Sequence, residues 1–275
     1  MRSIRSSLNC DEAAFTLLEL LVSMTISVII TWLVLTSISP LRRVLGEDIA
    51  RTKINQDLRG SLDIIGVDVR VGGENLVSTF PAIEIEQGIG TLPDQLVVRR
   101  NKLEDVLPLC TAVSSSSTAT QLFFANTSGI AGCTFSGQTQ AYNSWRSYRL
   151  AQPTQRVKAF LYNPSTKVGK FFEVTGEGTN GTNNYYLNII NPGWGANYPT
   201  TSAIYLLEEW RYRIVSNTLE LVENRNTANP FKIAFRIQNM QVSALMRDNT
   251  TKTSFTTSDN WALIKALKID LTGND

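Results

Sequence analysis

Histidine is absent from this sequence of 275 residues. Its absence excludes Ser-His-Asp and Cys-His catalysis, imidazole metal sites and the usual proton shuttle at neutral pH. An excess of one charge sign is also missing, because 26 basic and 24 acidic residues leave a formal net charge of +2. A near-neutral chain has no global basic field that would favour nucleic acid. The loops contain no EF-hand-like spacing of acidic residues, which would indicate a calcium site. From these absences together we predict no metal, no cofactor and no enzymatic activity.

One long apolar run, residues 15–39, follows a short polar segment, residues 1–14. Its last 20 residues carry no charge, and as a helix they would span about 30 Å, the thickness of the hydrocarbon core of a bilayer. The run is too long for the apolar region of a secretory signal peptide, and no small-residue cleavage site follows it. We therefore predict a single transmembrane helix over residues 15–39.

Glu19 is the only charged side chain in this apolar run. A carboxylate in a membrane costs several kcal/mol unless something compensates its charge. The sequence therefore singles out Glu19 as a candidate functional residue.

The helical pattern continues beyond Pro40, because apolar residues recur every three to five positions among charged ones. Gly72 and Gly73 are a stop signal. We predict that residues 40–73 are an amphipathic continuation of the helix. Its apolar positions are Leu41, Leu45, Ile49, Ile54, Leu58, Leu62, Ile65 and Val69.

Residues 74–275 have the pattern of a globular, β-rich domain, with short apolar segments separated by turn residues. Alternation of apolar and charged residues in 209–222, around the turn "SNT", predicts a hairpin with one buried face. Adjacent Glu208 and Glu209 would then point to opposite faces and form no acid/base pair. Two segments poor in apolar residues, 111–120 and 175–184, are predicted loops. Further strands are predicted at 94–101, 156–163, 169–176, 183–190, 231–246 and 261–273.

The fold class that these elements predict is α+β, with a long N-terminal helix packed on an antiparallel sheet. Of three cysteines, Cys10 precedes the apolar run, whereas Cys110 and Cys133 follow it on one side of the expected membrane. Their Ser-, Thr- and Gly-rich surroundings favour a disulfide in an oxidising compartment over two unrelated buried thiols.

A polar leader, a small residue and "FTLLE" leading into an apolar helix together resemble the type IV prepilin signature. The resemblance implies that prepilin peptidase cuts between Ala14 and Phe15 and that Phe15 is then methylated. It also implies that Glu19, fifth in the mature chain, is the assembly residue. The chain departs from the family pattern at Ala14, where glycine is usual.

The end of the long helix, "INQDLRGSLDIIGVDVRVGG", and the C-terminal segments "WRYRI" and "RIQNMQVSAL" resemble PilW-like minor pilins and J-type pseudopilins. The resemblance implies a pilin-like fold and a subunit of a type IV pilus that serves filament priming or the tip, in motility, adhesion or DNA uptake. A J-type pseudopilin of type II protein secretion is one alternative. A membrane-anchored adhesin or binding domain that does not assemble is another.

The partners implied are other pilin or pseudopilin subunits, prepilin peptidase and inner-membrane lipid. The expected location is the inner membrane with a periplasmic domain, and then a pilus or pseudopilus at the cell surface.

Two segments suggest ligand contacts. In residues 141–149, "AYNSWRSYR", aromatic and basic residues interleave, which would suit single-stranded DNA, although a half-buried strand explains the pattern as well. The residues for such a contact would be Trp145, Arg146, Tyr148 and Arg149. The Gly- and Pro-rich loop 191–199 is either a packed loop or a tip that binds a partner or carbohydrate.

Overall fold

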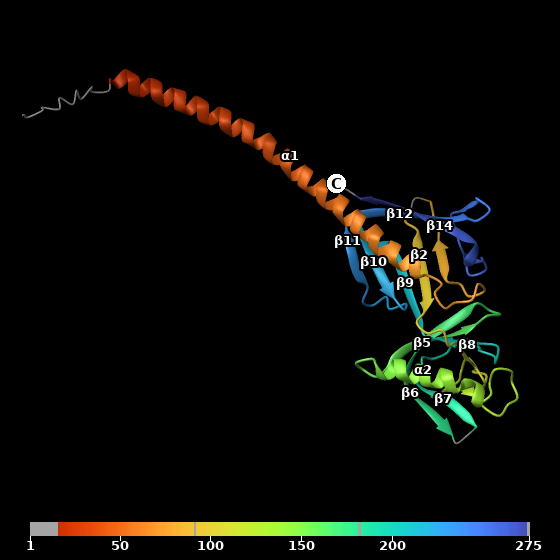
Figure 1. The fold of residues 1–275 in the computed structure, drawn as a ribbon. Helices are drawn as coiled ribbons and strands as arrows, with labels where there is room; N and C mark the ends of the chain where they lie inside the picture. The colour runs from red at the N-terminus through yellow and green to blue at the C-terminus, as the bar shows by residue number, and fades with distance from the viewer. Residues whose placement is uncertain (1–15, 91, 181–182, 274–275) are drawn as a thin grey trace, which may run out of the picture. The chain divides into compact units, whose positions relative to one another are not determined.

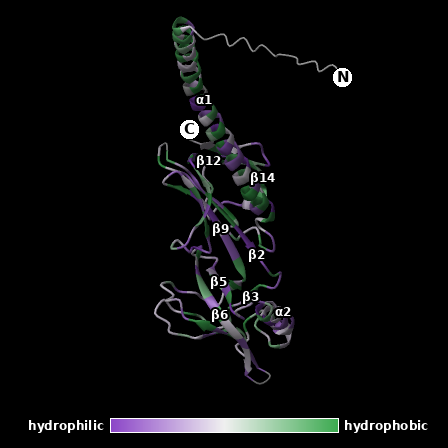
Figure 2. Ribbon diagram, turned by 90° about the vertical axis from the view of Figure 1, so that its left-hand side faces the viewer, coloured by the Kyte–Doolittle hydropathy of each residue, from purple (hydrophilic) through white to green (hydrophobic). Residues whose placement is uncertain are grey.

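The computed structural model describes residues 16–90, 92–180 and 183–273, and its longest element is one helix (Figure 1). This helix, α1 (Leu17–Val71), contains 55 residues and continues through Pro40, as the sequence predicts. The chain divides within it into two compact units, one ending at Lys53 and the other beginning at Ile54. Figure 2 shows hydrophobic residues along the beginning of the helix.

The part of α1 that belongs to the second unit packs against its core along one narrow stripe. Ile54, Ser61 and Ile65 are buried, and Leu58 and Val69 pack against the same cluster. Their spacing of three and four residues is that of one helix face. The predicted stripe included Leu62, which is 38% exposed. One position separates it from Ser61, and a single residue turns the side chain by about 100° around the helix.

The helix ends where the two glycines predict. Gly73 has a φ of +82°, and its N–H donates to the carbonyl oxygen of Arg99 at 2.8 Å. A Cβ at Gly73 would lie 2.3 Å from ring atoms of Trp261. Glycine is therefore required there both by the left-handed backbone and by the close approach of the indole.

One face of the packed end of α1 lies on a core formed by two antiparallel sheets. Their core contains Ile65 together with Leu96, Tyr212 and Met240, all fully buried. The five-stranded sheet has the order β1 (Ile83–Glu86), β2 (Gln95–Asn101), β9 (Leu207–Val215), β10 (Thr218–Glu223) and β11 (Phe231–Phe235). The three-stranded sheet has the order β13 (Thr251–Lys252), β12 (Ile237–Met246) and β14 (Ile264–Gly273), with the short turn η2 (Trp261–Leu263) before β14.

A six-stranded antiparallel sheet forms a second core with helix α2 (Thr139–Leu150). Trp145 of α2 is fully buried in that core. The short turn η1 (Ser136–Gln138) precedes α2. The sheet order is β3 (Leu107–Pro108), β8 (Ala203–Tyr205), β5 (Val157–Asn163), β6 (Val168–Asn180), β7 (Asn184–Ile190) and β4 (Gln121–Ala125).

An aromatic cluster links the two β-regions. The ring of Phe80, which precedes β1, lies 4.7 Å from that of Tyr162 and 4.8 Å from that of Tyr205, measured between centroids. Phe160 and Leu207 complete the buried cluster. These contacts bury apolar surface from both regions, which stabilises their junction.

Three predictions of local structure are wrong. Residues 231–246 form two strands in different sheets, because Arg236, with a φ of +62°, breaks the extended backbone between them. The predicted loop 175–184 is largely strand, since β6 extends to Asn180 and pairs with β7. Residues 141–149 lie in helix α2 and not in a half-buried strand. The side chains buried in α2, which are Ala141, Trp145 and Arg149, recur every four residues, as on one helix face.

Candidate functional site

Glu19 lies in the first turn of α1 and forms reciprocal hydrogen bonds with Thr16. The backbone N–H and the hydroxyl of Thr16 donate to Oε2 of Glu19 at 3.1 and 3.2 Å. The N–H of Glu19 donates to Oγ1 of Thr16 at 3.3 Å. This arrangement is a capping box, in which the two side chains satisfy backbone N–H groups at the helix start. The carboxylate is therefore held at the positive end of the helix dipole.

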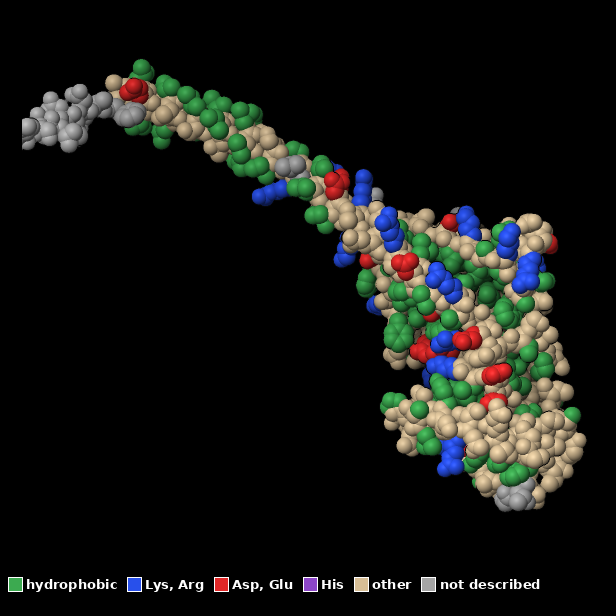
Figure 3. Space-filling view, in the orientation of Figure 1, with side chains coloured by type: hydrophobic (Ala, Val, Ile, Leu, Met, Phe, Trp, Pro, Cys, Tyr) green, Lys and Arg blue, Asp and Glu red, His purple; other side chains and the backbone are tan. Residues whose placement is uncertain are grey.

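The helix that follows Glu19 has an apolar surface that the described part of the chain leaves exposed. Leu20 is 55% exposed and Trp32 65% exposed, and none of the most apolar window of α1 is buried. By length and composition the helix could cross a membrane. In Figure 3 apolar side chains follow this part of α1, and charged ones appear only toward its later turns, apart from an acidic group at its start.

Six hydroxyl groups in the described part of this apolar stretch have partners within the helix. Each donates to a backbone carbonyl three or four residues earlier, at 2.7 to 2.9 Å. A hydroxyl bonded in this way costs little free energy when the helix is placed in lipid or in a helix bundle. The residues are Ser23, Thr25, Ser27, Thr31, Thr36 and Ser37.

The predicted leader 1–14 and the predicted cleavage point between Ala14 and Phe15 lie outside the described residues. The described chain begins one residue beyond the expected cut, at Thr16. Processing at Ala14 and methylation of Phe15 remain predictions.

The predicted disulfide joins Cys110 to Cys133, with their Cα atoms 5.7 Å apart. Both residues are buried. The N–H of Cys110 donates to the carbonyl oxygen of Phe123 at 2.8 Å, and the carbonyl oxygen of Cys133 accepts from Asn126 at 2.9 Å. The disulfide joins two loop segments, and these hydrogen bonds attach them to strand β4 and the residue that follows it.

The four residues proposed for a DNA contact do not form one accessible surface. Trp145 is buried, and its Nε1–H donates to the carbonyl oxygen of Asp105 at 3.0 Å. Arg149 is buried too, and its Nε–H donates to both carboxylate oxygens of Glu177 at 2.8 and 2.9 Å. The hydrogen bond to Glu177 raises the pKa of Arg149 above its usual value. Arg146 is exposed and Tyr148 half-buried. The predicted contact is wrong for Trp145 and Arg149, because neither can reach a nucleic acid.

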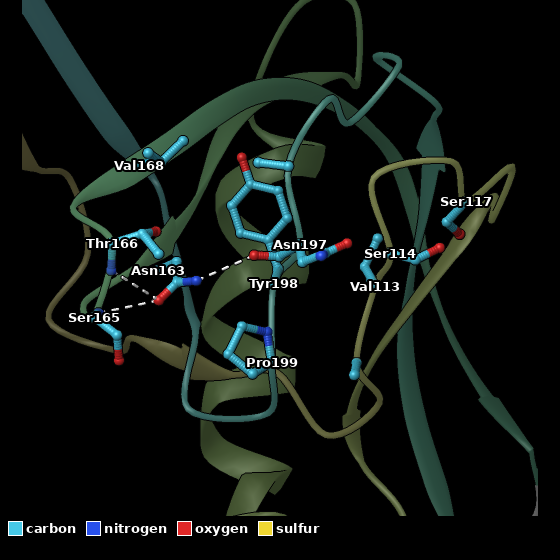
Figure 4. A pocket seen from close by; sticks show the side chains of 12 residues that line it. Val113, Ser114, Ser117, Asn163, Ser165, Thr166, Val168, Asn197, Tyr198 and Pro199 are labelled. Carbon is cyan, nitrogen blue, oxygen red and sulfur yellow. Dashed lines mark hydrogen bonds between the residues drawn. The ribbon is translucent and has the colours of Figure 1, made fainter.

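The loop 191–199 is packed, as one of the two interpretations predicts. Its aromatic residues Trp194 and Tyr198 are 2% and 1% exposed, so neither offers a ring face to a ligand. An open groove of about 800 Å³ runs beside Tyr198 and Pro199. Figure 4 shows the side chain of Asn163 in this groove, where its amide donates to the carbonyl oxygen of Asn197 at 3.1 Å and its oxygen accepts from the N–H of Ser165 at 3.0 Å. Asn163 thus shapes the loops of the groove.

A cluster of buried charges lies where β2 pairs with β9, and sequence reasoning did not identify it. The register places Arg99 opposite Glu209 and Arg100 opposite Glu208. Arg99 donates to Glu209 at 2.6 Å, with side chains 3% and 0% exposed, and Arg100 donates to Glu208 at 2.8 Å. The two glutamates have different partners, in agreement with the prediction that they form no acid/base pair. The sequence signal for this cluster is the basic pair in "VVRRN" and the acidic pair in "LLEEW". These pairs face each other once the two segments are aligned as neighbouring strands.

Glu209 is shared between two cations. Arg225, in the loop after β10, donates to its Oε1 at 3.1 Å, beside the bond from Arg99. Burial alone would raise the pKa of Glu209, but the charges of Arg99 and Arg225 outweigh it and hold that pKa below its usual value. The cluster is therefore ionised at neutral pH and has a structural role. Among residues 16–90, 92–180 and 183–273, no group of three or more His, Cys, Asp or Glu side chains could hold a metal ion.

Comparison with known proteins gives one match. Residues 10–35 match the family model described as the prokaryotic N-terminal methylation motif. No curated protein and no solved structure matches the chain significantly. The motif is a type IV pilin-like signal and indicates a precursor of the type IV pilin and pseudopilin class. It implies processing by prepilin peptidase and assembly with other pilins, and it favours a structural subunit over an enzyme.

Proposed function

We propose that this chain is a minor pilin, a structural subunit of a type IV pilus that primes the filament or lies at its tip. The observation that supports this most is the methylation motif over residues 10–35, which leads into an apolar helix that the described residues leave exposed. Lipid or the helices of other subunits would remove that surface from water.

Assembly in this proposal depends on Glu19. A cut between Ala14 and Phe15 creates a new amine four residues before Glu19, and methylation leaves it cationic. The carboxylate already lies at the start of α1, bonded to the N–H of Thr16 at 3.1 Å. In a bundle of apolar helices, pairing Glu19 with the amine of a neighbouring subunit compensates both charges in surroundings of low dielectric. Apolar helices then form the filament core, and the β-rich domains face outward.

The location follows from the same features. The helix over residues 15–39 crosses the inner membrane once, and residues 74–275 lie in the periplasm before the filament reaches the cell surface. The Cys110–Cys133 disulfide supports this side of the membrane, because disulfides persist in oxidising compartments. The described part of the β-rich domain contains three sheets, and a domain of this size favours a subunit present in few copies.

The test separates charge pairing from helix capping. Glu19→Gln keeps a capping-box acceptor but removes the charge, whereas Glu19→Ala removes both. We expect both variants to insert into the membrane normally and to lose incorporation into filaments, measured by fractionation and by immunoblotting of sheared pili. Glu47→Gln, at an exposed position of α1 paired with Arg43, is the matched control and should incorporate normally. Normal incorporation of Glu19→Gln would contradict the charge-pairing role.

Mass spectrometry of the N-terminus tests the processing step. We expect a chain that begins at a methylated Phe15. An intact Met1 would exclude processing and support an anchored adhesin or binding domain instead. Cross-linking of the assembled protein to secretion-system pseudopilins, and not to pilins, would assign it to the J-type pseudopilins.

A further inference from the structure

The six-stranded sheet has a covered face and an open face where β4, β6 and β7 lie side by side. Helix α2 packs on the covered face, in the core that contains Leu122 and Leu187, and Figure 2 shows α2 to one side of β5 and β6. The side chains that alternate with those core residues point to the opposite face. None of them is buried. This open face consists of Gln121, Phe123, Gly176, Gly178, Tyr186 and Asn188.

The open face carries aromatic rings and amides but no charged side chain. On the same side of β6, charged side chains begin at Glu173, which is paired with Arg156 at 2.9 Å. Without a cation, stacking on the rings would not be enough to hold single-stranded nucleic acid, whose phosphates require positive charge. An acidic sugar would lack a counter-ion for the same reason. The ligand that fits this face is therefore uncharged.

Tyr186 is positioned with its ring over the sheet. Gly178 stands opposite it in the register of β6 with β7, and a Cβ at Gly178 would overlap ring atoms Cζ and Cε2 of Tyr186. The glycine therefore provides the space in which the ring lies against the backbone of β6. Because Tyr186 is only half-buried, the other side of its ring remains open. Phe123 lies beside it, with the ring centroids 5.7 Å apart.

The amides of Gln121 and Asn188 lie next to the rings. Nε2 of Gln121 donates to Oδ1 of Asn188 at 3.3 Å, across β4 and β7. This bond leaves the side-chain oxygen of Gln121 and Nδ2 of Asn188 without a partner among the described residues, and neither atom is buried. An accessible acceptor beside an accessible donor matches a sugar hydroxyl, which donates and accepts hydrogen bonds at the same time.

We propose that this open face binds a neutral oligosaccharide. The C–H groups on one side of a sugar ring carry slight positive charge and stack on the negative face of an aromatic ring, here Tyr186 with Phe123 beside it. Hydroxyl groups of the same sugar bond to the amides of Gln121 and Asn188. The glycines of β6 leave the face without side chains that would close it into a pocket. It therefore fits a flat chain of equatorially linked hexoses, as in cellulose and chitin, better than a single terminal sugar.

The experiment uses the full-length protein in a detergent without a sugar headgroup, because a glycoside detergent would compete for the site. Isothermal titration calorimetry with cellohexaose and with chitohexaose measures binding to each kind of neutral chain. We expect saturable binding of at least one of them. The unfolding midpoint should then rise at saturating ligand, because a ligand that binds only the folded state stabilises it. An acidic oligogalacturonate and a single-stranded oligonucleotide should not bind. Binding of neither neutral chain, or tighter binding of either charged probe, would overturn the proposal.

Variants of the rings assign the binding to the open face. Tyr186→Leu removes the stacking surface but still covers Gly178, and Phe123→Leu removes the neighbouring ring. Each should weaken binding about three- to tenfold, the range for one aromatic contact. Tyr186→Phe keeps the ring and should bind nearly as the natural chain does. Tyr148→Leu, in α2 on the covered side of the sheet, is the matched control and should leave binding unchanged.

Gln121→Ala changes an exposed side chain outside the core, so it tests the amides without disturbing the fold. We expect weaker binding by this variant too, with a far-ultraviolet circular dichroism spectrum like that of the natural chain. Binding that Tyr186→Leu, Phe123→Leu and Gln121→Ala all leave unchanged would place the ligand elsewhere and overturn the proposal. Because the face lies apart from Glu19, assembly into filaments should proceed normally in these variants, so failure of this proposal is distinguishable from failure of the proposed function.

Discussion

Residues 17–53 and residues 54–71 belong to the same helix, yet among the described side chains only the second part has buried apolar ones. In the first part Ile29 is 57% exposed and Leu45 51% exposed, whereas in the second part Ile54 is 6% exposed and Ile65 is fully buried. Hydrogen bonding of the backbone is the same in both parts. Among the described residues, a core forms against the second part alone, and the first part, here called the uncovered part, keeps its apolar surface exposed.

Removal of a core side chain should produce the largest contrast. Ile65→Ala should lower the free energy of unfolding of the β-rich domain by about 2–5 kcal/mol, because it leaves a cavity among well-packed neighbours. Ile29→Ala, the matched change in the uncovered part, should leave that free energy unchanged. Denaturant unfolding of the full-length protein in detergent, followed by tryptophan fluorescence, measures both. Equal effects would mean that residues 17–53 also stabilise the domain.

A smaller effect is expected from the hydrogen bond that joins the packed part of α1 to β9. The hydroxyl of Tyr212, which is fully buried, donates to the carboxylate of Asp68. Tyr212→Phe should lower the free energy of unfolding by about 1.5–3 kcal/mol, the range for a hydrogen bond to a charged group. Asp68→Asn keeps an acceptor and should cost less. If both variants unfold as the natural chain does, this hydrogen bond does not help to hold α1 on the sheet.

Alkaline pH should affect the packed part and leave the uncovered part intact. Burial, together with the hydrogen bond to Asp68 and the charge of Asp68, raises the pKa of Tyr212 far above its usual value of about 10. Above pH 10 the unfolded chain loses this proton and the folded chain keeps it, so stability falls as pH rises. The expected slope is up to about 1.4 kcal/mol per pH unit for this group. Unfolding of the natural chain and of Tyr212→Phe between pH 9 and 11 measures it, and a slope that Tyr212→Phe leaves unchanged would contradict this origin.

The smallest effect is expected at an ion pair on the uncovered part. Arg43 and Glu47 are paired at 3.1 Å, with side chains 84% and 54% exposed. Arg43→Ala should lower the stability of the helix by no more than about 0.5 kcal/mol, because exposed pairs one turn apart contribute little. The helix content, measured by circular dichroism, should therefore change little. A larger loss would show that residues 17–53 depend on their own side-chain pairs more than on their surroundings.

Sequence reasoning succeeded where a pattern is local. The uncharged run, the two glycines at the end of α1 and the hairpin of β9 and β10 follow from periodicity and backbone preference alone. The same reasoning missed α2, because aromatic and basic residues that interleave suggested a strand, while the buried positions recur every four residues. It also missed the break at Arg236, since a left-handed residue other than glycine has little sequence signal.

The candidate sites divide in the same way. The position of Glu19 within the methylation motif and the pair of cysteines could be identified from residue type and spacing. The ionic cluster around Arg99 could not. Arg99 and Glu209 are 110 residues apart in the chain, and the register of β2 with β9 brings them together.

The sequence alone thus specified the apolar run over residues 15–39 with its single carboxylate, the end of α1 at two glycines and the signal over residues 10–35. Those features depend on neighbours within a few positions, where backbone sterics and hydrophobic periodicity act. Tertiary structure decided which face of α1 is buried and which charges are paired. Such properties depend on distances between segments far apart in sequence, and these are set by packing of the whole domain.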